Sequence, residues 1–359
     1  MRIDDIPADL RAALKRGLVI PACPLALNAK RAWDRRRQRA LVRYYVDAGA
    51  GGLAVGVHST QFAIREPGIA LYEPVLRLAS QEIDAWTAHR RREQRLLKIA
   101  GVCGRTPQAE REAALAESLG YHACLLSLSA FRDASVPELI AHCRTIAARM
   151  PLFGFYLQPA AGGRPLPCDF WRAFAEIPNV LGIKLAPFDR YRTLDAIRGV
   201  CEAGRENEIA LYTGNDDHIV ADLLTPWRIE TPRGTRRARI VGGLLGHWGF
   251  WTREAVRLLT RIREVADSDQ AIPPEFLTLN AQVTDANAAV FDAAHGFAGC
   301  LPGIHEMLRR GGLLEGRWCL DPKEELSPGQ AEEIDRICRS YPEMSDAAFV
   351  KPHLSEWLA

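Results

Sequence analysis

The sequence lacks the features that would assign it to several specialised classes of protein. No two of its nine cysteines are close enough to form a Cys-x-x-Cys motif, so neither a zinc ribbon nor a dithiol redox site is indicated, and reduced thiols in a cytoplasmic protein are the simplest interpretation. No stretch approaches the ~18 apolar residues that a membrane-spanning helix needs. The first long apolar stretch, residues 18–27, contains two prolines and lacks a convincing cleavage site, which favours a first strand over a signal peptide.

A strong charge of either sign is also missing. The chain has 46 Lys and Arg residues against 44 Asp and Glu residues, a net charge of +2, which predicts attraction neither to nucleic acid nor to a membrane surface. Hydrophobic residues make up 48% and charged residues 25% of the 359 residues. These proportions are typical of a globular protein, and one large domain with an extension fits the length best.

Apolar runs alternate with amphipathic stretches along most of the chain. The runs predict strands at residues 17–27, 52–57, 96–103, 122–128, 152–158, 180–186, 209–215 and 239–247, and the stretches between them predict helices, among them 36–48, 106–119, 136–150, 169–177 and 216–224. Because near-continuous apolar strands that alternate with helices indicate a parallel sheet, eight such units predict a (β/α)8 TIM barrel. An open doubly wound sheet is the structural alternative, but the glycine-rich phosphate turn typical of it does not follow the first strand.

The barrel is expected to occupy residues 17–268, with its last helix at about 252–267, and a C-terminal helical extension is expected at residues 269–359. The extension contains helical patterns at residues 275–294, 304–310 and 329–340. An arginine-rich stretch, residues 228–239, precedes the last strand. We therefore expect it on the barrel face away from the chemistry, as a solvated loop or a subunit contact rather than a nucleic-acid site.

Lys184 is the most informative residue, because an ammonium group has no structural use within the apolar run 180–186. Apolar surroundings disfavour its charged form, so its pKa falls and the neutral amine becomes able to attack a carbonyl. Tyr156 has a similar setting, since Gly154 precedes it by two positions as Gly182 precedes Lys184. If their strands are neighbours, the phenol and the amine are expected to meet over one substrate. The alternatives are a lysine that extends into solvent and a tyrosine of the core.

Other polar residues fall at the C-terminal ends of predicted strands, where the active site of such a barrel lies. They are His58, Ser59, Asn215 and His247, and ordinary loop polarity is the alternative for each. Asp216 and Asp217 are interpreted as helix caps rather than as an acid–base pair. No His, Asp or Glu cluster has metal-ligand spacing, although a metal site assembled from distant strand ends stays open.

Two motifs resemble the dihydrodipicolinate synthase and N-acetylneuraminate lyase family of class I aldolases. Tyr156-Leu-Gln-Pro159 is similar to that family's Tyr-Asn-x-Pro motif and Gly182-Ile-Lys184 to its Gly-Ile-Lys motif, and Tyr156 precedes Lys184 by 28 residues, the family's usual interval. The resemblance covers about residues 17–250. It implies that Lys184 forms a Schiff base, that Tyr156 moves protons and holds the bound carbonyl compound, and that the chain forms a homo-oligomer, a dimer or a tetramer.

The chain also departs from the family pattern. Val57-His-Ser-Thr-Gln61 replaces Gly-Thr-Thr-Gly-Glu, so His58 and Ser59 stand where the family has two carboxylate-binding threonines. The arginine that often follows the Tyr-Asn-x-Pro motif falls near Ala160, and the relay tyrosine contributed across the subunit boundary falls at Phe131. Dihydrodipicolinate synthesis itself is therefore not expected, whereas capture of a carbonyl compound by Lys184 is.

The sequence thus predicts a Schiff-base-forming lyase or aldolase that acts on a 2-oxo acid or a related small carbonyl compound, and it implies no cofactor because the lysine iminium itself is the electron sink. The predicted catalytic residues are Lys184 and Tyr156, and the predicted substrate-binding residues are His58, Ser59, Thr60, Phe131, Asn215 and Gly243. A protonated His58 could add charge at the carboxylate. Aromatic residues near strand ends, Phe62, Phe131, Phe188, Trp248 and Phe250, hint at an apolar or aromatic second substrate, with loop packing as the alternative.

Two other functions are alternatives. One is a non-catalytic small-molecule-binding barrel whose altered motif no longer supports turnover. The other is a metal-dependent sugar-acid enzyme with ligands such as His58, Asp216 and His247.

Overall fold

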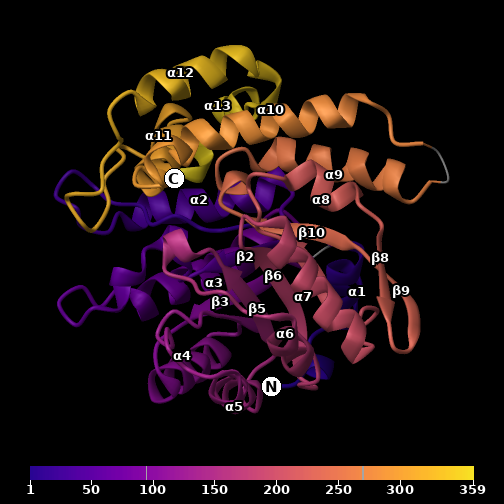
Figure 1. Ribbon diagram of the computed structural model, residues 1–359. Helices are drawn as coiled ribbons and strands as arrows, with labels where there is room; N and C mark the ends of the chain where they lie inside the picture. The colour runs from indigo at the N-terminus through magenta and orange to yellow at the C-terminus, as the bar shows by residue number, and fades with distance from the viewer. Residues whose placement is uncertain (94, 269–270) are drawn as a thin grey trace.

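The computed structural model describes residues 1–93, 95–268 and 271–359, and eight parallel strands form a barrel within them (Figure 1). The strands are β1 (Val19–Pro21), β2 (Gly52–Val55), β3 (Leu97–Val102), β4 (Ala123–Leu126), β5 (Leu152–Leu157), β6 (Val180–Ala186), β7 (Ala210–Thr213) and β10 (Ile240–Leu245). They neighbour one another in the order β1-β10-β7-β6-β5-β4-β3-β2. A parallel bridge between Ala22 and Ala54 joins β1 to β2. The TIM barrel and its eight predicted strands are confirmed.

Helices connect the strands and continue beyond the last one. The α-helices are α1 (Ala8–Arg16), α2 (Arg35–Ala48), α3 (Tyr72–His89), α4 (Thr106–Ser118), α5 (Val136–Ala147), α6 (Cys168–Ala175), α7 (Arg190–Ala203), α8 (Ile219–Leu224), α9 (Thr252–Ala266), α10 (Glu275–Val290), α11 (Cys300–Arg310), α12 (Gln330–Ser340) and α13 (Ala347–Trp357). Short 3-10 turns follow several strands, among them η2 (His58–Thr60), η4 (Pro159–Ala161) and η5 (His247–Gly249). Among the described residues, no helix combines the length and the apolar character required to cross a membrane.

Local signals fix where several helices begin. The Asp34 carboxylate accepts a hydrogen bond from the backbone N–H of Arg37 (3.0 Å) at the start of α2. A capping box between Ser135 and Glu138 begins α5. Gly49 ends α2 with φ 96°, a left-handed conformation that glycine adopts without strain. These contacts satisfy backbone groups that a helix end otherwise leaves unpaired.

The barrel interior is a separate apolar core that α1 closes from below. Leu10 and Leu14 of α1 pack with inward-facing strand residues such as Ile99 and Phe153. The Tyr212 hydroxyl inside the barrel donates a hydrogen bond to the carbonyl of Leu14 (2.8 Å) and accepts one from the backbone N–H of Leu18 (2.8 Å). This packing fills the N-terminal end of the barrel and leaves the carboxyl ends of the strands for the site.

The arginine-rich stretch is not a loop. Residues 227–238 form an antiparallel hairpin of β8 (Trp227–Thr231) and β9 (Gly234–Ala238), which extends away from the C-terminal helices in Figure 1. Gly234 has φ 95°, so it supplies the left-handed residue that the tight turn needs. The prediction of a loop was wrong because Trp227 and Ile229 alternate with the exposed Arg228 and Glu230, which is the pattern of a two-stranded ribbon with one covered face. The alternative of a subunit contact stays a prediction.

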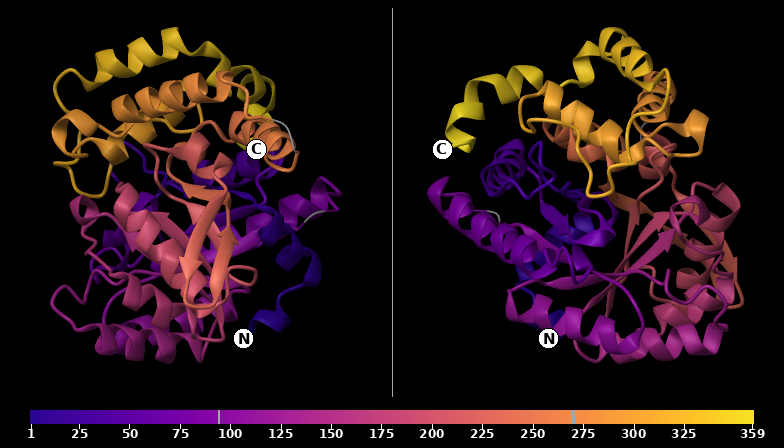
Figure 2. Two further views of the ribbon diagram at one scale, coloured as in Figure 1. Left: turned by 45° about the vertical axis from the view of Figure 1, so that its right-hand side comes forward. Right: turned by 90° about the vertical axis from the view of Figure 1, so that its left-hand side faces the viewer.

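The C-terminal helices α10–α13 pack on one side of the barrel (Figures 1 and 2). Their buried side chains, such as Phe276, Ile334 and Trp357, belong to the same core as the outward-facing strand residues. The predicted boundary between residues 268 and 269 lies next to residues 269–270, which are outside the described residues, and the two-part division stays a prediction.

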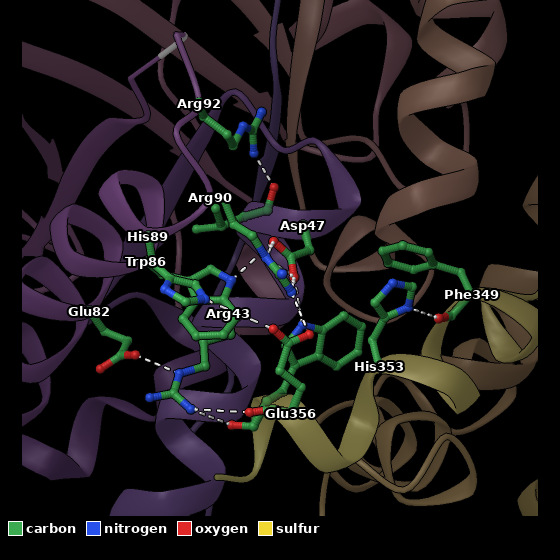
Figure 3. Close-up of polar contacts among 12 residues, drawn as sticks. Arg43, Asp47, Glu82, Trp86, His89, Arg90, Arg92, Phe349, His353 and Glu356 are labelled. Carbon is green, nitrogen blue, oxygen red and sulfur yellow. Dashed lines mark hydrogen bonds and ion pairs between the residues drawn. The ribbon is translucent and has the colours of Figure 1, made fainter.

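A polar cluster attaches α13 to α2 and α3 (Figure 3). The Asp47 carboxylate accepts hydrogen bonds from the indole N–H of Trp86 (3.0 Å), the indole N–H of Trp357 (2.8 Å) and the guanidinium of Arg90 (2.7 Å). Arg90 also binds Glu356 of α13 (2.7 Å). One buried carboxylate on α2 thus holds three elements together, which anchors the end of the extension to the barrel.

Candidate active site at the carboxyl ends of the strands

A cavity of about 120 Å³ opens at the carboxyl ends of the barrel strands. Barrel residues form most of its wall: Ala22, Val57, His58, Ser59, Phe155, Leu157, Gln158, Ala160, Ala161, Lys184, Ala186, Phe188, Gly214, Asp216 and Gly246. The extension contributes Phe291, Phe297, Cys300 and Ile304. A larger surface cleft of about 660 Å³ lies between α2 and α3, but it includes no residue from a strand end. Since the chemistry of a TIM barrel occurs at the carboxyl ends of its strands, the smaller cavity is the candidate site.

Lys184 extends from β6 into this cavity and is 9% exposed. Its Nζ lies 4.6 Å from the centre of the Phe155 ring and has no hydrogen-bond or ion-pair partner among the described residues. Burial lowers the pKa of the Lys184 amine to about 8, while the charge of Asp216 acts in the opposite direction. Roughly a tenth of the amine is therefore neutral at pH 7, far more than for an ordinary lysine, and the neutral form is the one that attacks a carbonyl.

Gly214 leaves the space that the Lys184 side chain occupies. A Cβ at position 214 would lie 2.5 Å from Cε and 2.9 Å from Cγ of Lys184. Because real Cβ contacts of this length essentially do not occur, any larger residue would displace the lysine. The glycine of the Thr213-Gly214-Asn215 turn therefore positions the amine.

Asp216 is the second charged group of the cavity wall, and it does not cap a helix. Helix α8 begins at Ile219 after His218, and no side chain caps its first turn, so the predicted capping role was wrong. The Asp216 carboxylate accepts a hydrogen bond from the backbone N–H of His247 (3.1 Å), and its backbone carbonyl accepts one from the Asn287 side chain of α10 (2.6 Å). Burial raises the pKa of the Asp216 carboxyl to about 7, against the opposing effect of the Lys184 charge.

His58 and Ser59 line the cavity from the turn after β2, and their role in substrate binding stays a prediction. Burial lowers the pKa of the His58 imidazole to about 4, and the charge of Lys184 lowers it further. His58 is therefore neutral at physiological pH. It can donate or accept a hydrogen bond there, but it does not supply the positive charge that the sequence suggested.

Tyr156 does not meet Lys184 in the cavity. The aligned residues of β5 and β6 are Phe155 with Lys184 and Tyr156 with Leu185, so Tyr156 points outward between strand and helix. Its ring packs on Trp171 (centroids 5.1 Å apart), and its hydroxyl donates to the carbonyl of Leu166 (3.2 Å) and accepts from the N–H of the same residue (3.1 Å). The expectation of a phenol beside the amine was wrong, and Phe155 occupies the place on the wall.

A shift in the register between β5 and β6 turns Tyr156 away from the cavity. At the start of the two strands Leu152 pairs with Val180, and this register would continue to align Tyr156 with Lys184. Between Leu152 and Phe153 the register shifts by one residue, so that Phe153 pairs with Gly182. A shift of one residue moves every following side chain of a strand to the opposite face relative to its partner strand.

The remaining predicted binding residues lie outside the cavity wall and have structural contacts. The Thr60 hydroxyl donates to the carbonyl of Cys23 after β1 (2.7 Å) and accepts from the N–H of Gly56 after β2 (3.0 Å). The Phe131 ring packs at a tilt against the His142 ring, with centroids 4.4 Å apart. A Cβ on Gly243 would contact Trp248 at 2.5 Å, on the outer side of the barrel.

Asn215 supports the site without lining it. It is fully buried, its side-chain amide donates to Asp222 (3.0 Å), and its carbonyl oxygen accepts from the backbone N–H of Phe188 (3.0 Å). Phe188 in turn lines the cavity. Of the five aromatic residues suggested near strand ends, Phe188 alone belongs to the wall.

The wall residues of the extension were not predicted. Phe291, Phe297, Cys300 and Ile304 follow β6 by more than one hundred positions. The apolar patterns of 275–294 and 304–310 could not reveal Phe291 and Ile304, because a helix that packs on a barrel and a helix that covers a pocket have the same amphipathic pattern. Phe297 lies outside the helices, where periodicity gives no signal.

His247 of the proposed metal set points elsewhere. Its ring contacts Phe250 and Trp251 (5.0 and 5.6 Å between centroids), and it lines a different surface cavity beside α9. Within the described residues, no group of three or more His, Cys, Asp or Glu side chains is arranged to hold a metal ion.

Sequence comparison places this site in a known family. The sequence matches the model of the dihydrodipicolinate synthetase family over residues 15–225, more than half of the chain. The chain belongs to this family. The match includes Lys184 and the predicted motif around Tyr156, whereas the extension lies beyond it. No curated relative matches the sequence.

Solved structures of dihydrodipicolinate synthase-family proteins have the same fold. YagE, a prophage protein of the family from E. coli K12 solved in complex with pyruvate, is 17% identical with a TM-score of 0.70, and the match covers 91% of this chain and 97% of that one. The dihydrodipicolinate synthase from Acinetobacter baumannii, complexed with pyruvate, is 18% identical with a TM-score of 0.72 over 91% and 99% of the two chains. The 4-hydroxy-tetrahydrodipicolinate synthase from Methylacidiphilum fumariolicum SolV is 18% identical with a TM-score of 0.72 over 93% and 98%.

Proposed function

We propose that the chain is a Schiff-base-forming lyase or aldolase that binds a small carbonyl compound, such as a 2-oxo acid, covalently at Lys184. The observation that carries this proposal is a desolvated lysine without an ion-pair partner among the described residues, at the strand-end cavity of a barrel from a lyase family. Two similar proteins were solved in complex with pyruvate, which makes pyruvate the first compound to test.

The neutral Lys184 amine attacks the carbonyl carbon, and the carbonyl oxygen leaves as water, so that an iminium ion forms. Its positive nitrogen accepts the electron pair of an adjacent carbon when that carbon loses a proton or a carbon substituent, which gives an enamine. In the direction of synthesis, the enamine carbon attacks an aldehyde, one C–C bond forms, and the aldehyde oxygen takes a proton. Water then hydrolyses the iminium and restores Lys184.

We assign the proton transfers of this sequence to Asp216 rather than to Tyr156. A carboxyl group whose pKa is about 7 is present in both protonation states near neutral pH, which is the condition for efficient proton transfer. Asp216 lines the same cavity as Lys184, whereas the Tyr156 hydroxyl forms hydrogen bonds with the backbone of Leu166 outside the cavity. Ser59 and neutral His58 are proposed to bind the carboxylate of a 2-oxo acid.

Borohydride reduction in the presence of pyruvate tests the assignment, because it converts the iminium into a stable secondary amine. The chain has six lysines, at positions 15, 30, 98, 184, 323 and 351, and peptide mass spectrometry distinguishes them. We expect the adduct on Lys184 and its loss in Lys184→Arg, since a guanidinium stays protonated. An adduct on a different lysine, or none with a panel of 2-oxo acids, contradicts the proposal.

Lys98 provides a matched control. It is also a buried strand lysine, 6% exposed, but its Nζ donates to the Asp84 carboxylate (2.9 Å) and to the Ser80 hydroxyl (3.1 Å). An ion-paired ammonium is a poor nucleophile. Lys98 should therefore remain unmodified, and Lys98→Arg should retain trapping at Lys184.

The same proposal includes a homo-oligomer and does not include dihydrodipicolinate synthesis. Position 131 holds a phenylalanine that carries no proton, and Tyr156 lies outside the cavity. Light scattering tests the oligomer, and an assay with pyruvate and aspartate semialdehyde tests the excluded reaction.

A further inference from the structure

Two phenylalanines stand at the opening of the Lys184 cavity. Phe188 comes from the turn after β6 and Phe297 from the segment between α10 and α11. Both are partly exposed, and their rings meet edge to face with centroids 5.6 Å apart. The barrel and the extension thus each contribute one aromatic ring to the same edge of the site.

Both phenylalanines have a left-handed backbone conformation, with φ 51° for Phe188 and 72° for Phe297. This conformation is unfavourable for a bulky side chain and persists only where the surroundings impose it. The Asn215 side-chain oxygen accepts a hydrogen bond from the backbone N–H of Phe188 (3.0 Å), and the carbonyl of Asp292 accepts one from the backbone N–H of Phe297 (2.9 Å). Two adjoining aromatic residues in this state beside a nucleophile indicate a ligand-contacting role.

The loop of Phe297 is itself fixed through Asp292. The Asp292 carboxylate accepts hydrogen bonds from the backbone N–H of Gly299 (2.9 Å) and from the Ser327 hydroxyl (2.5 Å). Phe297 is therefore held at the opening by contacts within the extension, and its place does not depend on packing against the barrel alone.

The wall is divided into a polar and an apolar side. His58 and Ser59 follow β2, which lies four strands from β6 in either direction around the barrel. On the β5 and β6 side the residues beyond Lys184 are mostly apolar, namely Leu157, Ala160, Ala161, Ala186 and Phe188, and Gln158 is the polar exception. A substrate with its carboxylate toward β2 would therefore present its other end to an apolar, aromatic surface.

We propose that the partner of the Lys184-bound carbonyl compound is an aromatic aldehyde, whose ring lies against Phe188 and Phe297. This inference rests on the proposed function. The enamine carbon forms a bond to the aldehyde carbon, the aldehyde oxygen takes a proton, and hydrolysis releases an aromatic aldol; cleavage is the same sequence reversed, and neither direction requires an oxidant or a reductant.

The size of the cavity fits this arrangement. An engineered protein cavity of about 150 Å³ accepts one benzene molecule, and the cavity here has about 120 Å³. The donor and an aromatic ring cannot both be enclosed. The ring must therefore lie at the opening, where the two partly exposed phenylalanines are.

The test compares benzaldehyde with glyceraldehyde as acceptors for pyruvate, in the wild-type chain and in Phe188→Asn and Phe297→Asn. Asparagine adopts left-handed backbone angles more readily than most residues, so both variants keep the local conformation accessible while they lose the ring. We expect the wild type to prefer benzaldehyde in kcat/KM, and each variant to lower that preference about tenfold. Tyr191→Ala is the control, because Tyr191 is an 84% exposed aromatic residue of α7 outside the cavity wall.

Two further readouts separate the possible failures. Borohydride trapping of pyruvate should be unchanged in both variants, and a wild-type chain that traps pyruvate yet prefers glyceraldehyde overturns the aromatic inference alone. Calorimetry with benzyl alcohol, which forms no imine, measures ring binding even if Lys184 traps nothing. Benzyl alcohol that binds no more tightly than glycerol, or equally in wild type and variants, also overturns the inference.

Discussion

Alanine at position 214 should inactivate Lys184 in a protein that still folds. The added Cβ would lie 2.5 Å from Cε of Lys184 and 2.8 Å from Cβ of Ala186. Gly214 has no positive φ, so the backbone tolerates alanine, and the lysine side chain has to move. A small-to-large change in a packed site costs about 1–3 kcal/mol of stability, which a protein of this size survives.

The effect on chemistry should be larger than the effect on stability. A misplacement of roughly 1 Å at a reacting group lowers the rate by about 100-fold, and the contact above requires a displacement of that order. The assay is the rate of borohydride-dependent incorporation of pyruvate at Lys184, read by mass spectrometry, together with thermal unfolding. We expect trapping to slow by about 100-fold or more in Gly214→Ala while the unfolding transition stays cooperative.

Gly243→Ala is the matched control for this experiment. Its Cβ would also meet a neighbour at 2.5 Å, the Trp248 ring, but on the outer side of the barrel. The two variants introduce similar overpacking, one just after β7 and the other within the neighbouring β10, and only Gly214→Ala displaces the amine. If Gly214→Ala traps pyruvate at the wild-type rate, or if Gly243→Ala loses trapping to the same degree, then space for Lys184 is not what Gly214 provides.

Four more outcomes follow from the site. Tyr156→Phe should leave pyruvate trapping unchanged and lower the free energy of unfolding by about 1–3 kcal/mol, since the buried N–H of Leu166 loses its acceptor. Chemical denaturation measures this free energy. A large loss of turnover at unchanged stability would show that the Tyr156 hydroxyl takes part in catalysis. His58→Ala should weaken capture of a 2-oxo acid equally at pH 6 and pH 8, because the imidazole pKa is about 4; a loss that grows toward pH 6 contradicts the neutral form. The rate of imine formation should rise with pH through about 8, where the Lys184 amine becomes neutral, and a rise only above pH 10 would mean an unperturbed lysine. Asp216→Asn should keep the fold and slow the proton-transfer steps about 10²–10⁴-fold, which hydrogen–deuterium exchange of pyruvate methyl protons would detect.

The eight strands and Lys184 could be predicted because their signals are local. Each strand is an apolar run bounded by helical patterns, and burial on both faces of a parallel strand makes such runs continuous. The lysine stands out within the run 180–186 because the strand has no structural use for its charge. Neither conclusion needs knowledge of which residues meet across the barrel.

Asp216 and the extension residues could not be predicted in the same way. Asp216 precedes a helix, and an aspartate there usually caps the helix; its role depends on where the backbone of His247 and the side chain of Asn287 hold it. Phe297 joins the site through a loop fixed by Asp292. These relations are tertiary, and composition and periodicity carry no record of them.

Tyr156 shows how a specific motif can mislead at the level of one residue. The interval of 28 residues between Tyr156 and Lys184 is what places two side chains on one face if the register that begins with Leu152 and Val180 is kept. The extra residue is Leu181, which is buried in the barrel interior together with Phe153. Leu181 has no partner in β5, and as a result Phe155 rather than Tyr156 lies on the cavity wall. A barrel with a phenyl ring instead of a phenol beside its lysine needs another group to carry protons, and Asp216 is that group. The same exchange makes the wall more apolar, which suits an apolar substrate held by Phe188 and Phe297. The two proposals made for this site therefore follow from the same shift in register.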